Sequence, residues 1–258
     1  MALTRLARFE ANGRVSWGIV ESPDGRLGTV IEIVSSPFDG VKATSTVYPL
    51  ADVRLLAPCV PSKIFALAHN YQSHLEGKPG PKEPQVFLKV PSSVINPGEP
   101  ILLPKGQGRV DEEAELVVVM GKRCKGVRRM DALRYVLGYT CGNDVSARIW
   151  QKNDLSWWRA KSSDTFSPFG PFILTDLDPR AATIIGRING REVQRCSPDD
   201  LIFDVPALIE WISASVTLEP GDLIFTGTSG DPAEIHPGDI VDVEIEGINV
   251  LSNLVGVV

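Results

Sequence analysis

Hydrophobic residues along this chain fall mostly into short runs separated by glycine, proline and asparagine, a pattern typical of β-strands joined by turns. The clearest turns are Asn12-Gly13 and Asn189-Gly190, each between β-prone runs, and this dipeptide is a strong signal for a two-residue hairpin. Asp24-Gly25 adds a further turn. Strands are predicted over residues 29–34, 64–68, 85–89, 139–141, 223–225 and 240–248.

Helical signals are few, so the pattern predicts a mainly β fold with some helix. A short helix is expected over residues 132–137, capped by Asp131 and ended by Gly138. Residues 204–213 have the period of an amphipathic helix. Its inward-facing residues are expected to be Leu208, Trp211 and Ile212.

The chain has 258 residues, of which 43% are hydrophobic, so it can bury a full-sized core. We interpret residues 1–58 as a small β-rich module and residues 59–258 as a larger domain. The boundary is placed at a linker or crossover around residues 53–60, and three prolines lie within or beside this segment. These prolines are Pro49, Pro58 and Pro61.

Composition and charge exclude several classes of function. The net charge of −6 and the lack of a clustered basic run argue against a nucleic-acid surface, which must neutralise phosphates. No apolar run approaches the roughly 20 residues of a membrane span, and the amino terminus lacks an apolar signal core, so we expect a cytoplasmic protein without a membrane partner. The histidines have no HxxH or HExxH spacing and the cysteines form no CxxC pair, which excludes the common zinc patterns.

A series of acidic residues leads into the most hydrophobic strand of the chain, within residues 110–121. Asp111, Glu113 and Glu115 alternate with other residues, so in an extended chain they share one face. Carboxylates about 7 Å apart repel each other by roughly 2 kcal/mol at an effective dielectric constant of about 20, so something must compensate. Solvent compensates if this is the wet end of a strand, whereas a hard divalent cation compensates if the carboxylates are ligands.

Asp144 supplies a carboxylate at the end of another apolar stretch, and this favours the cation. Residues 146–151 are predicted to form a helical turn that places Arg148 and Gln151 on one face, beside Asp144. A guanidinium there matches the geometry of a substrate carboxylate, although the same residue is equally compatible with an ordinary surface cation.

Three further segments carry candidate functional groups. Residues 69–76 include His69 and His74, follow a buried strand and precede a stiff proline-rich loop, so we interpret them as a mobile lid; a surface loop with two satisfied histidines is the alternative. Lys161 lies among aromatic residues and prolines, which predicts a place in a pocket wall. The turn 226–230 can offer backbone N–H groups to an anion, but such turns are common without function.

Six motifs, in the same order along the chain, resemble the fumarylacetoacetate hydrolase (FAH) family, specifically its short bacterial-type members. The resemblance runs from Pro61 to Val258, and the amino-terminal hairpin module is also similar. The motifs are Lys63-Ile64 with Asn70-Tyr71 and His74; Phe87-Leu88-Lys89 with Pro91-Ser92-Ser93; Val110-Asp111 with Glu113-Ala114-Glu115-Leu116; Gly142-Asn143-Asp144-Val145-Ser146-Ala147-Arg148; Ala160-Lys161 with Asp164-Thr165-Phe166; and Gly221-Asp222 with Thr226-Gly227-Thr228.

The resemblance implies an FAH-type mixed β-sandwich roll, preceded by the small β-rich module, that assembles as a homodimer. It also implies a divalent ion, Mg²⁺ or Mn²⁺, held by Glu113, Glu115 and Asp144, the three carboxylates that the pattern itself indicates. Asp111 then becomes a structural acid. The other roles implied by the family are assistance of an enolate by Lys161 and contact with the substrate by Tyr71, Arg148, Gln151 and Thr226.

Members of the family act on 2-oxo acids and their enols, often in the catabolism of aromatic compounds. Their common step is stabilisation of an enolate by a metal that chelates the 2-oxo-carboxylate. Hydrolytic members also resemble one another in a lid histidine paired with a glutamate three residues later, which activates water. Here the histidine is His74, position 77 is Gly77 and the acid is Glu76, so the pairing departs from the family pattern.

Three functional hypotheses follow. The first is a metal-dependent hydrolase that cleaves a C–C bond in an acylpyruvate-type 2-oxo acid of the fumarylpyruvate or acetylpyruvate class, with His74, Glu76 and Lys161 as catalytic residues. The alternative is an isomerase or decarboxylase of 2-hydroxy-dienedioates or oxaloacetate on the same metal. The last is a binding protein that keeps a metal-held pocket for 2-oxo acids without turnover.

Overall fold

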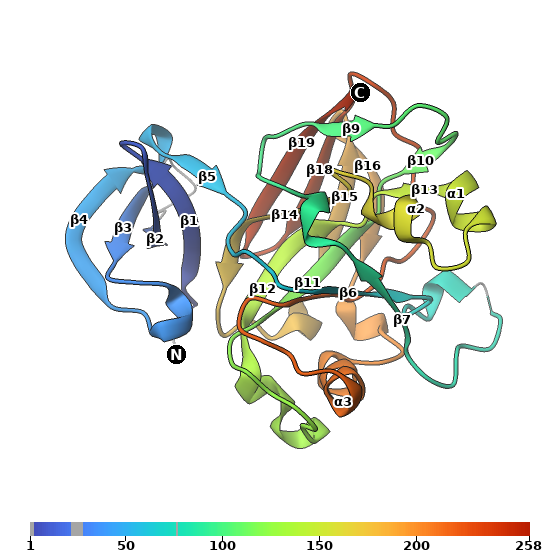
Figure 1. The fold of residues 1–258 in the computed structure, drawn as a ribbon, viewed down its shortest axis with the longest axis horizontal. Coiled ribbons are helices and arrows are strands. Elements are labelled where there is room, and N and C mark those ends of the chain that lie inside the picture. Colours follow the sequence, from blue (N-terminus) through green and yellow to red (C-terminus); the bar gives the residue numbers. More distant parts are fainter. Residues whose placement is uncertain (1–2, 22–27, 76) are drawn as a thin grey trace.

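The computed structural model describes residues 3–21, 28–75 and 77–258, and most of its regular structure is β-strand, as the sequence predicts (Figure 1). The predicted turn at Asp24-Gly25 and the predicted catalytic Glu76 lie outside the described residues. In the described part of the chain, no helix is long and apolar enough to cross a membrane.

Four antiparallel strands from the amino-terminal part of the chain lie to one side of the main body (Figure 1). They are β1 (Arg5–Ala11), β2 (Arg14–Glu21), β3 (Thr29–Ile33) and β4 (Ala43–Pro49). The hairpin predicted at Asn12-Gly13 is confirmed, and both residues have the positive φ, 53° and 74°, that a type I′ turn requires. The segment predicted as a linker instead contains a strand, β5 (Arg54–Leu56), which pairs with β1.

The amino-terminal strands continue into the large sheet of the main body, because β1 pairs with β14 (Ser167–Leu174). The order of strands is β4-β3-β2-β1-β14-β12-β11-β17-β6-β7, with β5 attached to β1 and β8 (Val94–Ile95) attached to β14. The remaining strands are β6 (Ile64–Ala68), β7 (Gln85–Lys89), β11 (Ala114–Met120), β12 (Val136–Asn143) and β17 (Leu223–Phe225). The predictions at 64–68, 85–89 and 223–225 are therefore confirmed.

A second sheet, ordered β16-β15-β18-β19-β9, packs against the centre of the first. Its strands are β9 (Ile101–Leu103), β15 (Ile184–Ile188), β16 (Arg191–Cys196), β18 (Ile240–Ile245) and β19 (Asn249–Val257). Leu116 and Val118 of β11 belong to the same buried core as Val243 and Ile245 of β18. A short pair, β10 (Val110–Asp111) and β13 (Ser146–Ala147), lies beside the site described below.

Helices are few and short, and two helical predictions need correction. The α-helices are α1 (Arg148–Asn153), α2 (Trp158–Ser162) and α3 (Val205–Ser215). Asp204 caps α3 by accepting a hydrogen bond from the Ala207 N–H, and Leu208 and Ile212 are buried, but Trp211 is 43% exposed rather than inward-facing. The 3-10 helices are η2 (Pro37–Asp39), η3 (Leu50–Asp52), η4 (Ser73–Leu75), η5 (Pro91–Ser93), η6 (Arg129–Tyr135), η7 (Pro179–Ala181) and η8 (Pro198–Asp200).

The helix predicted over residues 132–137 is the second correction. The structure has η6 there, and Val136 already belongs to β12. Asp131 does not cap this helix, because its carboxylate pairs with Arg128 at 2.9 Å and with Arg134 at 3.1 Å. Pairing of β12 with β11 from Val136 onward outweighs the local helical signal.

Candidate active site

The three carboxylates predicted to meet do so at one end of the β11–β12 pair. Glu113 precedes β11, Glu115 lies within it and Asp144 follows β12, and the antiparallel register places Ala114 opposite Asn143. The backbone N–H of Asp144 donates to the carbonyl of Glu113 at 3.0 Å. One oxygen from each carboxylate lies within 4.8 Å of the others, and all three residues are buried.

Asp111 does not join this cluster, which corrects the expectation that it shares one strand face with Glu113 and Glu115. Residues 110–121 are not one strand: β10 pairs with β13, whereas β11 pairs with β12, and residues 112–113 break the alternation. The Asp111 carboxylate instead accepts hydrogen bonds from Arg109 Nε at 2.6 Å and Arg148 Nε at 2.7 Å.

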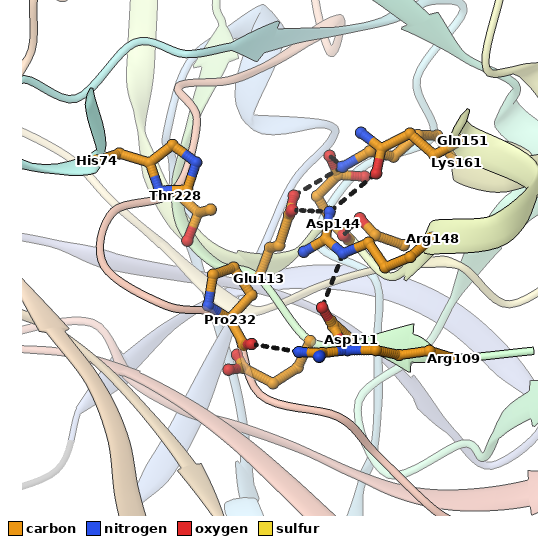
Figure 2. Close-up of polar contacts among 12 residues, drawn as sticks. His74, Arg109, Asp111, Glu113, Asp144, Arg148, Gln151, Lys161, Thr228 and Pro232 are labelled. Atoms are coloured by element: carbon orange, nitrogen blue, oxygen red, sulfur yellow. Dashed lines mark hydrogen bonds and ion pairs between the residues drawn. The ribbon is translucent and has the colours of Figure 1, made fainter. Parts of the chain in front are cut away.

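Three cations compensate the charge of Glu113 and Asp144, and Figure 2 shows two of them, Lys161 and Arg148. Lys161 Nζ bridges the two, at 2.7 Å from Glu113 Oε2 and 2.6 Å from Asp144 Oδ2. Arg148 Nη1 lies 2.8 Å from Glu113 Oε1, and Lys89 Nζ lies 2.5 Å from Asp144 Oδ1. Burial alone would raise the pKa of Glu113, but Lys161 and Arg148 outweigh it and hold this pKa at about 2.

Glu115 is held differently from its two neighbours. Its Oε2 accepts a hydrogen bond from the backbone N–H of Gly227 at 2.7 Å, while Oε1 is buried and has no hydrogen-bond partner among the described residues. Burial and the nearby charges of Asp144 and Glu113 raise the pKa of Glu115 well above its ordinary value. Gly227 is required for this contact, because it has φ of 96° and a Cβ would lie 3.1 Å from the Leu67 carbonyl.

This arrangement fits a divalent cation. Hard divalent ions take oxygen ligands, and carboxylates are the usual protein donors. Glu113, Glu115 and Asp144 present such oxygens within ligand-sharing distance, and the partnerless Oε1 of Glu115 is the kind of buried atom that an ion would satisfy. These three residues are therefore the candidate metal ligands.

A cavity of about 240 Å³ opens onto Glu113 and contains four of the predicted site residues, His74, Arg148, Gln151 and Lys161. In Figure 2, His74 and Thr228 lie on one side of Glu113, and Lys161, Arg148 and Gln151 lie on the other. Arg148 Nη1 also donates to Gln151 Oε1 at 3.0 Å, so the two residues share one face as predicted, although the helix begins at Arg148 because Ser146 and Ala147 belong to β13. The remaining lining residues are Leu67, Ala68, His69, Phe87, Trp157 and Thr228.

Tyr71 and Thr226, predicted to contact the substrate, do not line this cavity. Tyr71 is fully buried, and its hydroxyl has no hydrogen-bond partner in the part of the chain that is described. Thr226 is also fully buried and donates from Oγ1 to the Leu116 carbonyl at 2.9 Å. Thr228, two residues further along, is the hydroxyl residue that reaches the cavity.

The imidazole of His74 has a defined tautomer. Its Nδ1 lies 2.8 Å from the carbonyl oxygen of Gly230. A carbonyl oxygen can only accept, so Nδ1 carries the hydrogen and Nε2 of the neutral ring carries the lone pair. His74 is therefore arranged as a proton acceptor at the edge of the cavity.

Sequence reasoning missed several residues of this site. Lys89 is fully buried against Asp144 and the Lys161 carbonyl, although a lysine at the end of a strand usually indicates solvent. Phe87 and Trp157 pack edge to face, with ring centroids 5.4 Å apart. Trp157 has φ of 57°, a strained conformation for such a residue that often marks functional sites. His69, which the sequence did indicate, has a similar φ of 55°.

A larger hollow of about 600 Å³ lies elsewhere, between the beginning of β12 and the amino-terminal end of α3. It shares no lining residue with the carboxylate cavity. Its walls are mostly leucine, valine and proline, and no metal-ligand cluster among the described residues lies in it. The smaller cavity is therefore the one that carries candidate chemistry.

Comparison with known proteins identifies the class of protein. A family model described as fumarylacetoacetate (FAA) hydrolase C-terminal matches residues 63–256, and one described as Rv2993c-like, N-terminal matches residues 4–58. The chain belongs to the fumarylacetoacetate hydrolase family. The resemblance and the FAH-type fold predicted from the sequence are thus confirmed.

Three similar proteins illustrate the range of activities around this chain. The solved structure of 5-carboxymethyl-2-hydroxymuconate delta-isomerase from Mycobacterium smegmatis is 42% identical, with a TM-score of 0.93, and the match covers 98% of this chain and 100% of that one. The mitochondrial oxaloacetate tautomerase fahd2 of Xenopus laevis is 40% identical over 79% of this chain and 68% of its own. Maleylpyruvate hydrolase from Sphingobium sp. SYK-6, solved with manganese(II) and pyruvate, is 30% identical, with a TM-score of 0.79 and 98% of each chain covered.

Proposed function

We propose that this protein is a divalent-metal-dependent enzyme that converts 2-oxo acids through an enolate. The observation that carries the proposal is the convergence of Glu113, Glu115 and Asp144 beside Lys161. Glu113 and Lys161 line a cavity whose opposite side holds the proton-accepting His74. A bound ion supplies a Lewis acid for the negative charge that develops on the substrate oxygen.

The cationic residues of the cavity have distinct roles. Burial lowers the pKa of Lys161, but Asp144 and Glu113 outweigh it and raise this pKa above its ordinary value. Lys161 therefore remains an ammonium that donates hydrogen bonds to an enolate oxygen and does not act as a base. Arg148 offers a guanidinium to a substrate carboxylate, and Gln151 keeps its amide nitrogen for the same ligand because its Oε1 already accepts from Arg148.

The first candidate reaction is hydrolysis of an acylpyruvate of the fumarylpyruvate or acetylpyruvate class. His74 Nε2 takes a proton from water, the resulting hydroxide attacks the acyl carbonyl, and the C–C bond breaks with its electrons passing to the pyruvate enolate. Lys161 then faces the enolate oxygen. Glu76 is the acid that would assist His74 in this reaction.

The second candidate is isomerisation, tautomerisation or decarboxylation of a 2-hydroxy-dienedioate or oxaloacetate. One observation favours it: the described partner of His74 Nδ1 is the Gly230 carbonyl, a neutral acceptor, where a water-activating dyad would place a carboxylate. A single imidazole is sufficient to move a proton between carbon and oxygen.

A substrate panel separates these reactions. Purified protein with Mg²⁺ or Mn²⁺ is offered acetylpyruvate, fumarylpyruvate, oxaloacetate and 2-hydroxyhepta-2,4-diene-1,7-dioate, and products are identified by NMR. We expect turnover of at least one, and a loss of roughly 100-fold or more in His74→Ala. Thermal stabilisation by a 2-oxo acid without any product would instead identify a binding protein.

The proposal includes Mg²⁺ or Mn²⁺ as the ion and a homodimer as the assembly. The manganese(II) in the maleylpyruvate hydrolase supports the choice of ion. Activity after chelation and re-addition of each ion, together with metal analysis, tests it, and light scattering at several concentrations tests the dimer. Active protein that contains no divalent ion would contradict the metal-dependent mechanism.

A further inference from the structure

The start of the turn that carries His74 is hydrogen-bonded to a residue far away in the sequence. η4 starts at Ser73, and the first N–H groups of a helical turn have no partner within the turn. Asp200, at the end of η8 and 127 residues away, supplies a hydrogen-bond acceptor for one of these N–H groups. Its Oδ2 accepts from the Ser73 N–H at 2.9 Å and from the Ser73 hydroxyl, and its carbonyl accepts from the Gln72 N–H at 3.0 Å.

The chain before Gln72 is held by other contacts. The Asn70 carbonyl accepts from the Ile202 N–H at 2.8 Å, and its side-chain oxygen accepts from the Phe203 N–H at 3.0 Å. Asn70 Nδ2 also donates to the Thr226 carbonyl at 2.9 Å. These contacts fix Asn70 and do not involve the Asp200 side chain, whose own contacts are made to Ser73.

His74 has three contacts that hold it in the described structure, one of which is the stacking of its ring on that of His69, with centroids 6.4 Å apart. Asp200 holds the backbone immediately before it, and the Gly230 carbonyl holds its ring. A carboxylate makes stronger hydrogen bonds to N–H and O–H donors than a neutral acceptor does. Because a general base works only within hydrogen-bond reach of the proton it takes, a small displacement of this turn removes the imidazole from that position.

We propose that Asp200 is a positioning residue for His74: its carboxylate caps the turn Ser73–Leu75 from outside and so sets where Nε2 meets the substrate. This inference rests on the proposed role of His74 as the base. It assigns no contact with substrate or metal to Asp200.

The experiment compares Asp200→Ala and Asp200→Asn with Asp199→Asn, which removes a charge from an exposed neighbour on the same η8. We expect Asp200→Ala to lower kcat roughly tenfold to hundredfold, with Asp200→Asn intermediate and Asp199→Asn unchanged. KM for the 2-oxo acid and the Kd for Mn²⁺ should change little, because the groups that bind them lie at one end of the β11–β12 pair and on α1 and α2. An unchanged kcat in Asp200→Ala would overturn the proposal.

Coupling to His74 distinguishes positioning from a general loss of structure. In a His74→Ala background, Asp200→Ala should lower the residual kcat no further, because the side chain to be positioned is gone. An equal fold-loss in both backgrounds would show a merely structural role and would overturn the inference.

A readout independent of activity keeps the two proposals separable. Amide hydrogen exchange at Ser73 and His74 should accelerate in Asp200→Ala and not in Asp199→Asn. If His74→Ala retains full activity while exchange responds as expected, the base role of His74 fails and the capping by Asp200 stands. Unchanged exchange in Asp200→Ala would contradict the capping itself.

Discussion

Glu115 differs from Glu113 and Asp144 at the level of single side chains, because it contacts a backbone N–H where they contact ammonium or guanidinium groups. Without a metal it is therefore the destabilised member of the cluster. Glu115→Gln should raise the unfolding free energy in EDTA by roughly 1–3 kcal/mol at pH 7, the usual cost of a buried group without its partner. The amide still accepts from Gly227 and can donate to the neighbouring carboxylates.

The stability gained by Glu115→Gln should depend on pH in a definite direction. Folding raises the pKa of Glu115, so the wild-type protein takes up a proton on folding, and its stability falls as the pH rises above the ordinary carboxyl range. The advantage of Glu115→Gln should therefore be present at pH 7 and absent near pH 4, in chemical denaturation with EDTA.

Glu113→Gln is the matched comparison and should act in the opposite direction. Lys161 and Arg148 already neutralise Glu113, so its replacement leaves both cations short of a partner and destabilises the metal-free protein. The alternating acidic residues alone would suggest that removing one charge relieves repulsion between carboxylates and stabilises the protein. That argument does not apply to Glu113. If Glu115→Gln and Glu113→Gln shift stability in the same direction, the charge assignment is wrong.

Lys89 lies beneath the cluster, and its side chain is inaccessible to solvent. Lys89→Met leaves the Asp144 carboxylate short of a cation, so we expect a loss of about 3 kcal/mol in unfolding free energy in EDTA. The loss should shrink when Mn²⁺ is added, because a bound ion replaces the missing positive charge. Chemical denaturation with and without Mn²⁺ measures both values.

Lys63→Met is the control for Lys89→Met. Lys63 pairs with Asp222 at 2.7 Å, and neither residue belongs to the candidate metal cluster. The loss of unfolding free energy in Lys63→Met should be the same with and without Mn²⁺. If Mn²⁺ changes the stability of Lys89→Met and Lys63→Met equally, Lys89 does not compensate the charge of the metal site.

The predictable and unpredictable parts of the site have different physical origins. Glu113, Glu115 and Asp144 could be predicted because each carboxylate lies at the end of an apolar stretch, where local pattern and chemistry agree. The role of Lys89 could not be predicted, because its burial depends on β7 lying beside α2. This is a contact between segments about 70 residues apart. The pairing of Asp111 with Arg148 depends likewise on the β10–β13 contact.

At the level of elements, the turn that follows β17 joins three parts of the site. The Gly227 N–H holds Glu115, Thr228 lines the cavity and the Gly230 carbonyl holds His74. Gly227→Ala should cost about 1–3 kcal/mol, because φ is 96° and the new Cβ would lie 3.1 Å from the Leu67 carbonyl. It should also weaken Mn²⁺ binding by moving Glu115, as measured by calorimetric titration.

Gly230→Ala separates backbone strain from crowding in the same turn. Gly230 also has a positive φ, 66°, but a Cβ there would meet no atom within 4 Å. We expect a smaller loss of stability and nearly unchanged Mn²⁺ affinity. Equal losses of affinity in the two variants would show that Glu115 does not depend on the position of Gly227.

The elements that the sequence predicts well are those specified by neighbouring residues. Both Asn-Gly hairpins are confirmed, because their turn conformation depends on two adjacent residues. The helix expected over residues 132–137 is instead a 3-10 helix that ends at Tyr135, since pairing with β11 recruits Val136 and Leu137 into a strand. Trp211 shows the same limit, because helical period alone does not define which side of α3 is covered.

At the level of the whole molecule, the site depends on strand neighbours that no local pattern specifies. β6 and β17 are parallel neighbours, with Ile64 opposite Leu223, although they are separated by about 150 residues. This pairing brings the His74 turn after β6 beside the Gly227 turn after β17. The amino-terminal strands are joined to the same sheet through β1 and β14.

Leu6 tests whether that junction makes the chain one cooperative unit. It lies on β1, is 1% exposed and packs with Val119 of β11, Phe169 of β14 and Leu223 of β17. Leu6→Ala should cost about 3 kcal/mol, as deletion of a fully buried leucine side chain usually does, and should lower the unfolding midpoint of the whole protein. Leu3→Ala, at a 58% exposed position nearby, should have little effect.

The form of the unfolding transition decides between one unit and two. Trp17 lies in β2 of the amino-terminal strands, whereas Trp157 lies beside the cavity, so fluorescence of single-tryptophan variants that retain one or the other follows the two parts separately. If the continuous sheet couples them, Leu6→Ala shifts both signals to the same lower midpoint, because the core that Leu6 fills includes the strands that carry the site. A shift confined to the Trp17 signal would mean that the amino-terminal strands unfold alone and that the β1–β14 pairing does not transmit stability to the metal-binding end of β11.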